Sequence, residues 1–287
     1  MAYFTNNITE EKKEFKVVKA RLLALSARGA SHWLSDLPEP KLGQLSMSNV
    51  KFSFTLRFRL GLPLILLNFK KCACKKIGIT IEHICSCPTF SKTHRHMGPL
   101  LTLRQICNSA GLPNTYETPV DADVIDVERK GSEHVMHAIT AMLMGEEENI
   151  HKDNVDVMVL HPFAKAYLDP AGRDKKNSTS AFKSLAAADA GVLIKKKRYC
   201  NWSARQRLNR SGHELVPFVL ETFGGIHKFA VDLLRKISNY VAQYDAPLSA
   251  IILSNYIKMI STSVQIGVID MVFKACHDYK VMHYGKA

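Results

Sequence analysis

Cysteine and histidine residues are concentrated in one short segment, and this cluster constrains the fold more than any other feature of the sequence. Cys72-Ala-Cys74 is followed by Glu82-His83-Ile-Cys85-Ser-Cys87, so five potential metal ligands fall within sixteen residues. The surrounding stretch, 70–88, has too few large apolar residues for a core of its own. A zinc ion held tetrahedrally by four of these side chains would supply the missing stability.

We expect the zinc ligands to be Cys72, Cys74, His83 and Cys87. His83 and Cys87 are four positions apart and therefore share one face of a helical turn, whereas Cys85 points elsewhere. Cys85 in place of Cys87 stays an open alternative. Because Cys-x-Cys is a tighter spacing than the usual Cys-x2-Cys, a cluster of free thiols is the alternative to the zinc site as a whole. The isolated cysteines are expected to be buried core residues; they are Cys107, Cys200 and Cys276.

The charge of the chain points to a polyanionic partner. Its 287 residues carry a net charge of +13 at pH 7, which favours nucleic acid. Seven cysteines are an odd count, and the polar first residues do not form a secretion signal, so a disulfide framework is not expected. The apolar stretch 60–69 is shorter than the ~20 residues that a membrane span needs. We therefore expect an intracellular protein without a membrane segment.

Hydrophobic periodicity divides the chain into helices followed by an α/β alternation. Helices are expected over 9–25, 46–62, 96–111, 133–144, 184–199 and from 225 onward, and strands over 120–127, 155–160 and 216–222. Three regions follow from this pattern: a helical segment over 1–69, the Cys/His knuckle with its following helix over 70–111, and an α/β domain with C-terminal helices over 112–287.

A series of short motifs occurs in an order that resembles a known family. The motifs are Ala20-Arg-Leu-Leu-Ala-Leu-Ser26, Ala30-Ser-His-Trp-Leu34, Leu56-Arg-Phe-Arg-Leu-Gly-Leu-Pro63, Cys72-Ala-Cys74, His83-x3-Cys87, Arg95-His96, Asp156-Val-Met-Val159 and Val219-Leu-Glu-Thr-Phe-Gly-Gly225. This order is similar to the C-terminal, restriction-like endonuclease region of non-LTR retrotransposon polyproteins. The Tyr-x-Asp-Asp signature of their reverse transcriptase does not occur in the chain.

The resemblance implies a PD-(D/E)xK restriction-endonuclease-like core, a mixed sheet flanked by helices, preceded by a helical segment and a small zinc knuckle. In this class two carboxylates on adjacent strands hold a divalent ion, and a nearby lysine polarises the attacking water or the phosphate. Hard oxygen ligands suit Mg²⁺, which generates hydroxide and neutralises charge on the phosphate.

Carried onto this sequence, the resemblance implies Asp123 as the first magnesium carboxylate and Asp156 as the second. Asp121 and Asp126 are rivals to Asp123, since a register error of one residue moves a side chain to the other face of a sheet. Met158 stands where the family usually carries its lysine. The lysine is then expected from the following helix as Lys195, with its neighbours Lys196 and Lys197 as alternatives, and Glu221 is expected to join the site.

Basic residues in several segments are candidates for contact with the DNA backbone, which requires only positive charge. They are Arg57, Arg59, Lys75, Lys76, Arg95, His96, Lys196, Lys197 and Arg198. Trp33 and Trp202 could stack on a base, but aromatic residues of this kind are more often packing residues.

The function implied by these features is a Mg²⁺-dependent DNA endonuclease with a structural zinc, nicking target DNA by phosphodiester hydrolysis for a retroelement. DNA, together with element RNA, is the expected partner, and the nucleus the expected location. The alternative is a catalytically decayed nucleic-acid-binding protein that keeps the knuckle and the basic surface; a third is a structural protein that only uses the fold. The acids at positions 123 and 156 favour the enzyme, whereas Met158 and the long interval between the two acids favour the binding protein.

Overall fold

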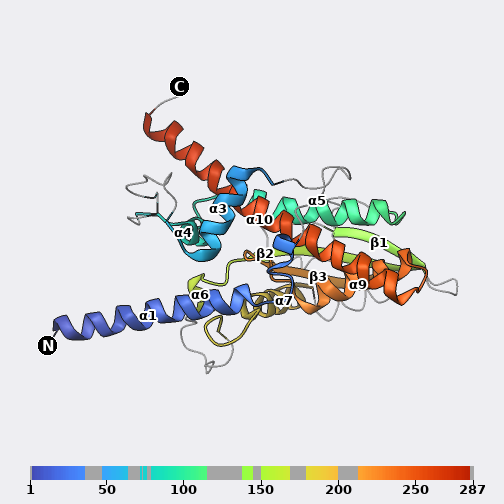
Figure 1. The fold of residues 1–287 in the computed structure, drawn as a ribbon, viewed down its shortest axis with the longest axis horizontal. Coiled ribbons are helices and arrows are strands. Elements are labelled where there is room, and N and C mark those ends of the chain that lie inside the picture. The colour runs from blue at the N-terminus through green and yellow to red at the C-terminus, as the bar shows by residue number, and fades with distance from the viewer. Residues whose placement is uncertain are drawn as a thin grey trace.

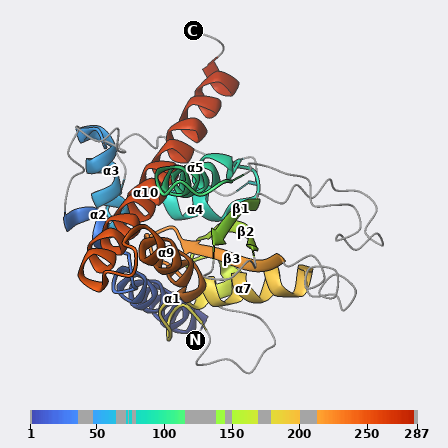
Figure 2. The same cartoon turned by 90° about the vertical axis from the view of Figure 1, so that its right-hand side faces the viewer.

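A three-stranded sheet lies between helices in the part of the chain that the structure describes (Figures 1 and 2). The structure is a computed structural model that describes residues 2–35, 47–63, 72, 74–75, 79–114, 138–144, 150–168, 179–199 and 213–284. Its elements are α1 (Ala2–Leu25), α2 (His32–Ser35), α3 (Asn49–Leu60), α4 (Ile81–Ser86), α5 (Thr93–Ser109), β1 (Ala138–Met144), β2 (Ile150–Leu160), α6 (Lys165–Leu168), α7 (Ala186–Tyr199), β3 (His213–Glu221), α9 (Lys228–Val241) and α10 (Ala246–Tyr284).

Helices α1, α3, α5 and α7 confirm the helices expected over 9–25, 46–62, 96–111 and 184–199. The ends of α3 show why the sequence places it there. The hydroxyl of Ser48 accepts a hydrogen bond from the amide of Lys51, and Gly61 ends the helix in the left-handed region at φ 72°.

The helix expected over 133–144 is wrong in its second half, because Ala138–Met144 forms strand β1. This segment pairs antiparallel with β2, from Ala138 opposite Asp156 to Met144 opposite Ile150. This segment mixes the helix formers alanine, leucine and methionine with the β-branched Ile139 and Thr140, so its composition is compatible with either state, and the backbone hydrogen bonds offered by β2 decide it. The strands expected over 155–160 and 216–222 are confirmed as β2 and β3, whereas the one expected over 120–127 lies outside the described residues.

The sheet is mixed, because β2 pairs antiparallel with β1 and parallel with β3. The parallel register sets Asp156 opposite Pro217 and Leu160 opposite Glu221, so these four residues share one face. Helix α7 packs on that face, and α5 packs on the other (Figure 2). The expected α/β class with a mixed sheet flanked by helices is therefore confirmed, whereas a complete PD-(D/E)xK core is not shown.

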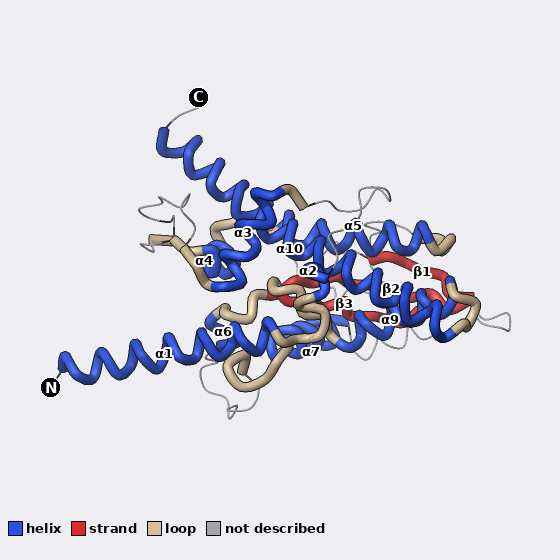
Figure 3. Tube along the Cα trace, viewed as in Figure 1, coloured by secondary structure: helices blue, strands red, loops and turns tan. Residues whose placement is uncertain are grey.

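The second face of the sheet carries the main hydrophobic core. Val157, Phe218 and Leu220 pack there with residues of α5, α9 and α10. Helices α2, α3 and α4 also contact α10, so the helical segment, the knuckle and the α/β part share this core (Figure 3).

Helix α10 is long and apolar enough to cross a membrane by length and composition alone, over Ala246–Asp278. The longest apolar segment of the described chain is therefore this helix and not the stretch 60–69, and the expectation of a protein without a membrane segment stays a prediction. However, 67% of its most apolar window is buried inside the protein, and core helices of soluble proteins meet the same criterion. Buried polar side chains such as Thr262 and Gln265 lie within this helix.

Candidate functional site

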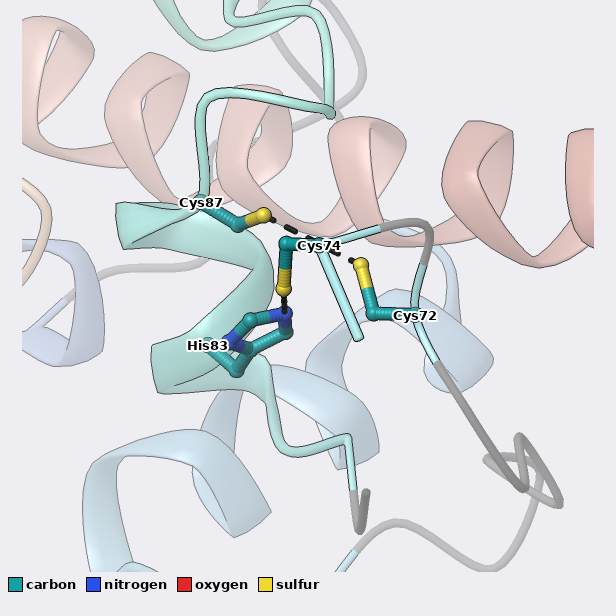
Figure 4. A group of neighbouring side chains, drawn as sticks. All are labelled: Cys72, Cys74, His83 and Cys87. Carbon is teal, nitrogen blue, oxygen red and sulfur yellow. Dashed lines mark hydrogen bonds between the residues drawn. The ribbon is translucent and has the colours of Figure 1, made fainter. Parts of the chain in front are cut away.

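Four side chains from two chain segments converge in the Cys/His knuckle (Figure 4). His83 and Cys87 come from α4 and its C-cap, and Cys72 and Cys74 come from the segment before it. The ligand atoms of all four lie within 4.8 Å of one another. The four residues are those expected from the sequence, and the cluster can hold a metal ion such as zinc.

The distances within the cluster fit a tetrahedral zinc site. With zinc–sulfur bonds of about 2.3 Å and zinc–nitrogen bonds of about 2.0 Å, ligand sulfurs lie about 3.8 Å apart and sulfur and nitrogen about 3.5 Å apart. The two Sγ atoms of Cys72 and Cys87 are 3.9 Å apart. The Sγ of Cys74 lies 3.5 Å from Nε2 of His83. Two opposite edges of the tetrahedron thus have the dimensions of a zinc site.

Local hydrogen bonds hold the knuckle in this shape. The hydroxyl of Thr80 caps α4 by accepting from the amide of His83, which lies 3.2 Å away. Burial raises the pKa of the Cys87 thiol, but hydrogen bonds with the side chain and backbone of Thr89 and with the neighbouring thiols outweigh it, so the net pKa is lowered. A lowered pKa favours the thiolate, which is the form that binds metal.

Cys85 does not join the cluster, which answers the alternative left open by the sequence. Its side chain is buried, and burial raises the pKa of its thiol to about 12. The carbonyl of Cys85 accepts a hydrogen bond of 2.8 Å from Nη1 of Arg95, a buried residue of α5. Arg95 therefore supports the knuckle from inside.

Asp156 and Lys195 form a second candidate site, at the interface of β2 with α7. The Nζ of Lys195 lies 2.6 Å from Oδ2 of Asp156, and their side chains are only 7% and 3% exposed. On either side of Lys195, residues 193–194 and 196–197 are exposed, so this lysine alone in that stretch turns inward. The structure thus brings together the acid and the lysine expected from the sequence.

Gly191 allows α7 to lie close enough to the sheet for this pair to form. A Cβ atom at Gly191 would lie 2.6 Å from Cδ1 of Leu160 and 2.8 Å from Cγ1 of Val219, closer than atoms can pack. Met158, at the position where the resemblance expects a lysine, is half-buried and packs against the same helix. Lys195 reaches the sheet one turn after Gly191.

Glu221 does not lie with Asp156 and Lys195, which corrects the expectation that it joins the site. Glu221 pairs with Leu160, whereas Asp156 pairs with Pro217. The two acids are therefore four residues apart along the strand direction, a distance of roughly 13 Å. Its Oε1 accepts from the amide of Ala188 at 3.2 Å, in the first turn of α7. Glu221 is thus an anchor for the N-terminus of α7, whereas Lys195 lies two turns further along.

Burial raises the pKa of Glu221 to about 7, and the like charge of Asp189 adds to this effect, although amides of Ala188 and Ala187 oppose it. The native state therefore binds a proton more tightly than the unfolded chain, with its reference pKa of 4.5. Stability from this group is fully present below pH 4.5 and is lost as the pH rises through 7. Between these two pH values the free energy of unfolding of the wild-type protein should fall by roughly 3 kcal/mol. We expect this fall to be absent in Glu221→Gln.

Urea unfolding at a series of pH values checks this expectation. The control is Asp232→Asn, because the Asp232 carboxylate lies at the surface, 2.6 Å from Arg235. Equal pH slopes for the wild-type protein and Glu221→Gln between pH 4.5 and 7 contradict it.

Three residues expected to contact DNA are turned inward instead. The Nη1 of Arg59 donates to the carbonyl of Phe223 at 2.6 Å, and burial lowers the pKa of Arg59 to about 10. Arg95 is buried against Cys85, and the Nε2–H of half-buried His96 donates to the carbonyl of Val157 at 3.0 Å. These contacts with internal carbonyls correct the expectation of DNA contact for all three.

The other candidate DNA-binding residues lie on or near the surface where the structure describes them. Lys75, Lys196 and Lys197 are exposed, and half-buried Arg57 donates to the carbonyl of Pro63. Lys196 lies 4.4 Å from the ring centroid of Phe229. Trp33 and Cys107 are buried core residues, as expected, whereas Cys276 is only half-buried and packs at the edge of the core. The remaining expectations fall on residues or side chains outside the described part: Lys76, Asp121, Asp123, Asp126, Arg198, Cys200 and Trp202.

Two supporting residues were missed by the sequence reasoning. Thr80 stands three residues before His83, which is the spacing of a helix N-cap and could have located the start of α4. Gly191 lies in the middle of α7, where the close packing of the helix against the sheet requires a residue without a side chain. No local sequence pattern predicts this role of Gly191.

Comparison with known proteins gives no relative against which these sites could be aligned. No family model, no curated protein and no solved structure matches the chain.

Proposed function

We propose that this chain is a metal-dependent DNA endonuclease of the PD-(D/E)xK type, derived from a non-LTR retroelement, that nicks target DNA by phosphodiester hydrolysis. The observation that carries the proposal is the buried ion pair between Asp156 and Lys195. The sequence resemblance selected this acid and this lysine, 39 positions apart, and they are in direct contact at the helix–sheet interface.

A buried ion pair needs a reason other than stability. Removing two charges from water costs several kcal/mol per ion, and well-packed apolar residues in their place are often as stable or more so. The surroundings of Asp156 and Lys195 offer such packing, with Val192 and Val219 nearby in the helix–sheet interface. Charged groups kept in such a place are candidates for chemistry.

The chemistry that the proposal assigns to these residues follows from their types. When bound, Mg²⁺ would supply a hydroxide near neutral pH and neutralise charge on the phosphate. Asp156 would give one carboxylate ligand and Asp123, outside the described residues, the other. Lys195 would place its ammonium group beside the phosphate oxygens, and the exposed Lys196 and Lys197 would hold the DNA backbone.

The Cys/His knuckle enters the proposal as a structural zinc site, because four protein ligands leave no open position for catalysis. The net charge of +13 supports DNA, together with element RNA, as the partner. A nuclear location belongs to the same proposal.

Cleavage of supercoiled plasmid tests the function. We expect nicking with Mg²⁺ and none with EDTA, and a loss of ~100-fold or more in Asp156→Asn. Asp232→Asn is the matched control, because Asp232 pairs with Arg235 on the exposed face of α9. Nicking that persists in EDTA, or that Asp156→Asn leaves unchanged, contradicts the proposed site.

A nucleic-acid-binding protein without nuclease activity is the second candidate. One observation favours it: the ammonium group of Lys195 lies 2.6 Å from the Asp156 carboxylate, and Asp156 belongs to no cluster of metal ligands among the described side chains. In this case the same assay shows no nicking in any variant, while the chain still binds DNA with an affinity that falls steeply with salt.

A further inference from the structure

Helix α1 has apolar residues on two opposite faces. Ala20, Ala24 and Ala27, at the end of the helix and in the turn after it, are buried against the body of the protein. Phe15, Val18 and Leu22 are instead 67%, 56% and 63% exposed. With 100° of rotation per residue, these two stripes lie on opposite sides of the helix. The outer stripe of Phe15, Val18 and Leu22 is therefore an apolar surface directed away from the body.

The spacing of the outer stripe is that of a coiled coil. Phe15, Val18 and Leu22 follow one another at intervals of three and four residues, which corresponds to positions a, d and a of a heptad. The sequence carries the same spacing upstream through Phe4, Ile8 and Glu11, with one polar residue in the series. Surface helices with a single packed face do not need this repeat.

The position of α1 leaves room for a partner helix. Figure 1 shows α1 projecting beyond the other labelled elements, with its N-terminal end farthest from them. In the described part of the chain, no element covers the outer stripe, as the exposure of its three side chains shows. A helix packed on that side would lie opposite the body to which α1 is attached.

The charges beside the stripe are complementary to those of the same helix in a second copy. Glu14 and Lys19 flank the stripe on opposite sides, at heptad positions g and e, and are five residues apart. In a parallel pair of identical helices, position g of one contacts position e of the other five residues later. Glu14 of each copy then meets Lys19 of the other, whereas an antiparallel pair places the Lys19 flanks together.

From this geometry we propose that α1 forms a parallel two-stranded coiled coil with α1 of a second copy of the chain. Phe15, Val18 and Leu22 form its apolar seam, and Glu14 pairs with Lys19 across it. The interface is self-complementary, as a two-fold symmetric dimer requires. The proposal does not depend on the nuclease function, since it uses neither Asp156 nor the knuckle.

Sedimentation equilibrium of the full chain tests the dimer. We expect a concentration-dependent mass that rises toward twice the 32.2 kDa of one chain. Val18→Asp should lower the association constant at least ~100-fold, because it buries a charge in the seam. Leu193→Asp is the matched control, because Leu193 is 68% exposed on α7 and lies outside the stripe.

A charge exchange tests the parallel arrangement. Glu14→Lys and Lys19→Glu should each weaken the dimer, and the double variant should restore it to near the wild-type affinity. Lys19 also lies 4.4 Å from the ring centroid of Phe182, so the thermal unfolding of each variant is compared in parallel. A chain that stays monomeric overturns the proposal and assigns the stripe to another protein. A dimer that Val18→Asp leaves intact, or that the exchange does not restore, overturns it as well.

Discussion

Replacing Asp156 by alanine is expected to lower the free energy of unfolding by about 3–5 kcal/mol, because it leaves the ammonium group of Lys195 buried and without its counter-charge. The two side chains are 3% and 7% exposed, so water cannot solvate the remaining charge without opening the helix–sheet interface. Replacing both partners, as Asp156→Ala with Lys195→Met, should recover part of this loss. Urea unfolding of the wild-type protein, both single variants and the double variant gives the coupling energy between them.

An exposed ion pair of the same chain provides the control for this cycle. Arg235 and Asp232 are also 2.6 Å apart, but their side chains are 46% and 36% exposed on α9. Their coupling should be only about 0.2–1 kcal/mol. A coupling of that size between Asp156 and Lys195 would mean that the lysine leaves the carboxylate in solution, and the closed site described above would then be wrong.

The stability of this pair and its proposed chemistry can be separated. Asp156→Asn keeps the shape of the side chain and removes its charge, so a loss of nicking in a folded protein reports on the site itself. If the double variant regains stability but not nicking, the pair is kept for its chemistry. Such a result matches the general finding that buried ion pairs can often be replaced without loss of stability.

Much of the fold could be predicted because it depends on sequence patterns within short segments. Serine and glycine mark the ends of α3, and the acid and β-branched run of β2 marks a buried strand. The spacing of His83 and Cys87 fixes which side chains of α4 share a face, and it separates Cys85 from the ligands. In each case, residues a few positions apart contain the whole signal.

The errors concern features that only tertiary structure decides. An arginine looks the same in sequence whether it contacts phosphate or, like Arg59, an internal carbonyl. Glu221 ends a strand next to the one that carries Asp156, but the register sets the two residues at different levels of the sheet. The strand β1 forms where apolar residues without clear periodicity meet the free edge of β2. Each outcome depends on a partner from a distant segment.

Two adjacent residues of α5 connect the knuckle with the strand that carries Asp156. Arg95 donates to the carbonyl of Cys85 between His83 and Cys87, and His96 donates to the carbonyl of Val157 next to Asp156. Beyond Asp156, β1 no longer pairs with this edge of β2, and His96 provides the hydrogen bond there. The same helix therefore supports both candidate sites, which explains why Arg95 and His96 face inward.

Removing zinc is the second change with a large expected effect. We expect metal analysis of the purified chain to give one zinc per protein, and prolonged chelation to lower the melting temperature and to unfold the segment from Cys72 to Cys87. That segment has little core of its own, and zinc contributes about 10–16 kcal/mol to the folding of peptides with four such ligands. Replacement by Co²⁺ should give the visible absorption of a tetrahedral thiolate site.

Two substitutions on the same helical turn distinguish metal binding from general packing. Cys87→Ser should abolish binding of zinc and Co²⁺, because it removes one of the four ligands. Cys85→Ala should keep one zinc per chain, although it removes a side chain that is only 1% exposed and therefore also destabilises the protein. Both variants lose stability, so the zinc content and not the melting temperature is decisive. Loss of zinc in Cys85→Ala with retention in Cys87→Ser would exchange their roles, and a wild-type chain that binds no zinc would contradict the metal site.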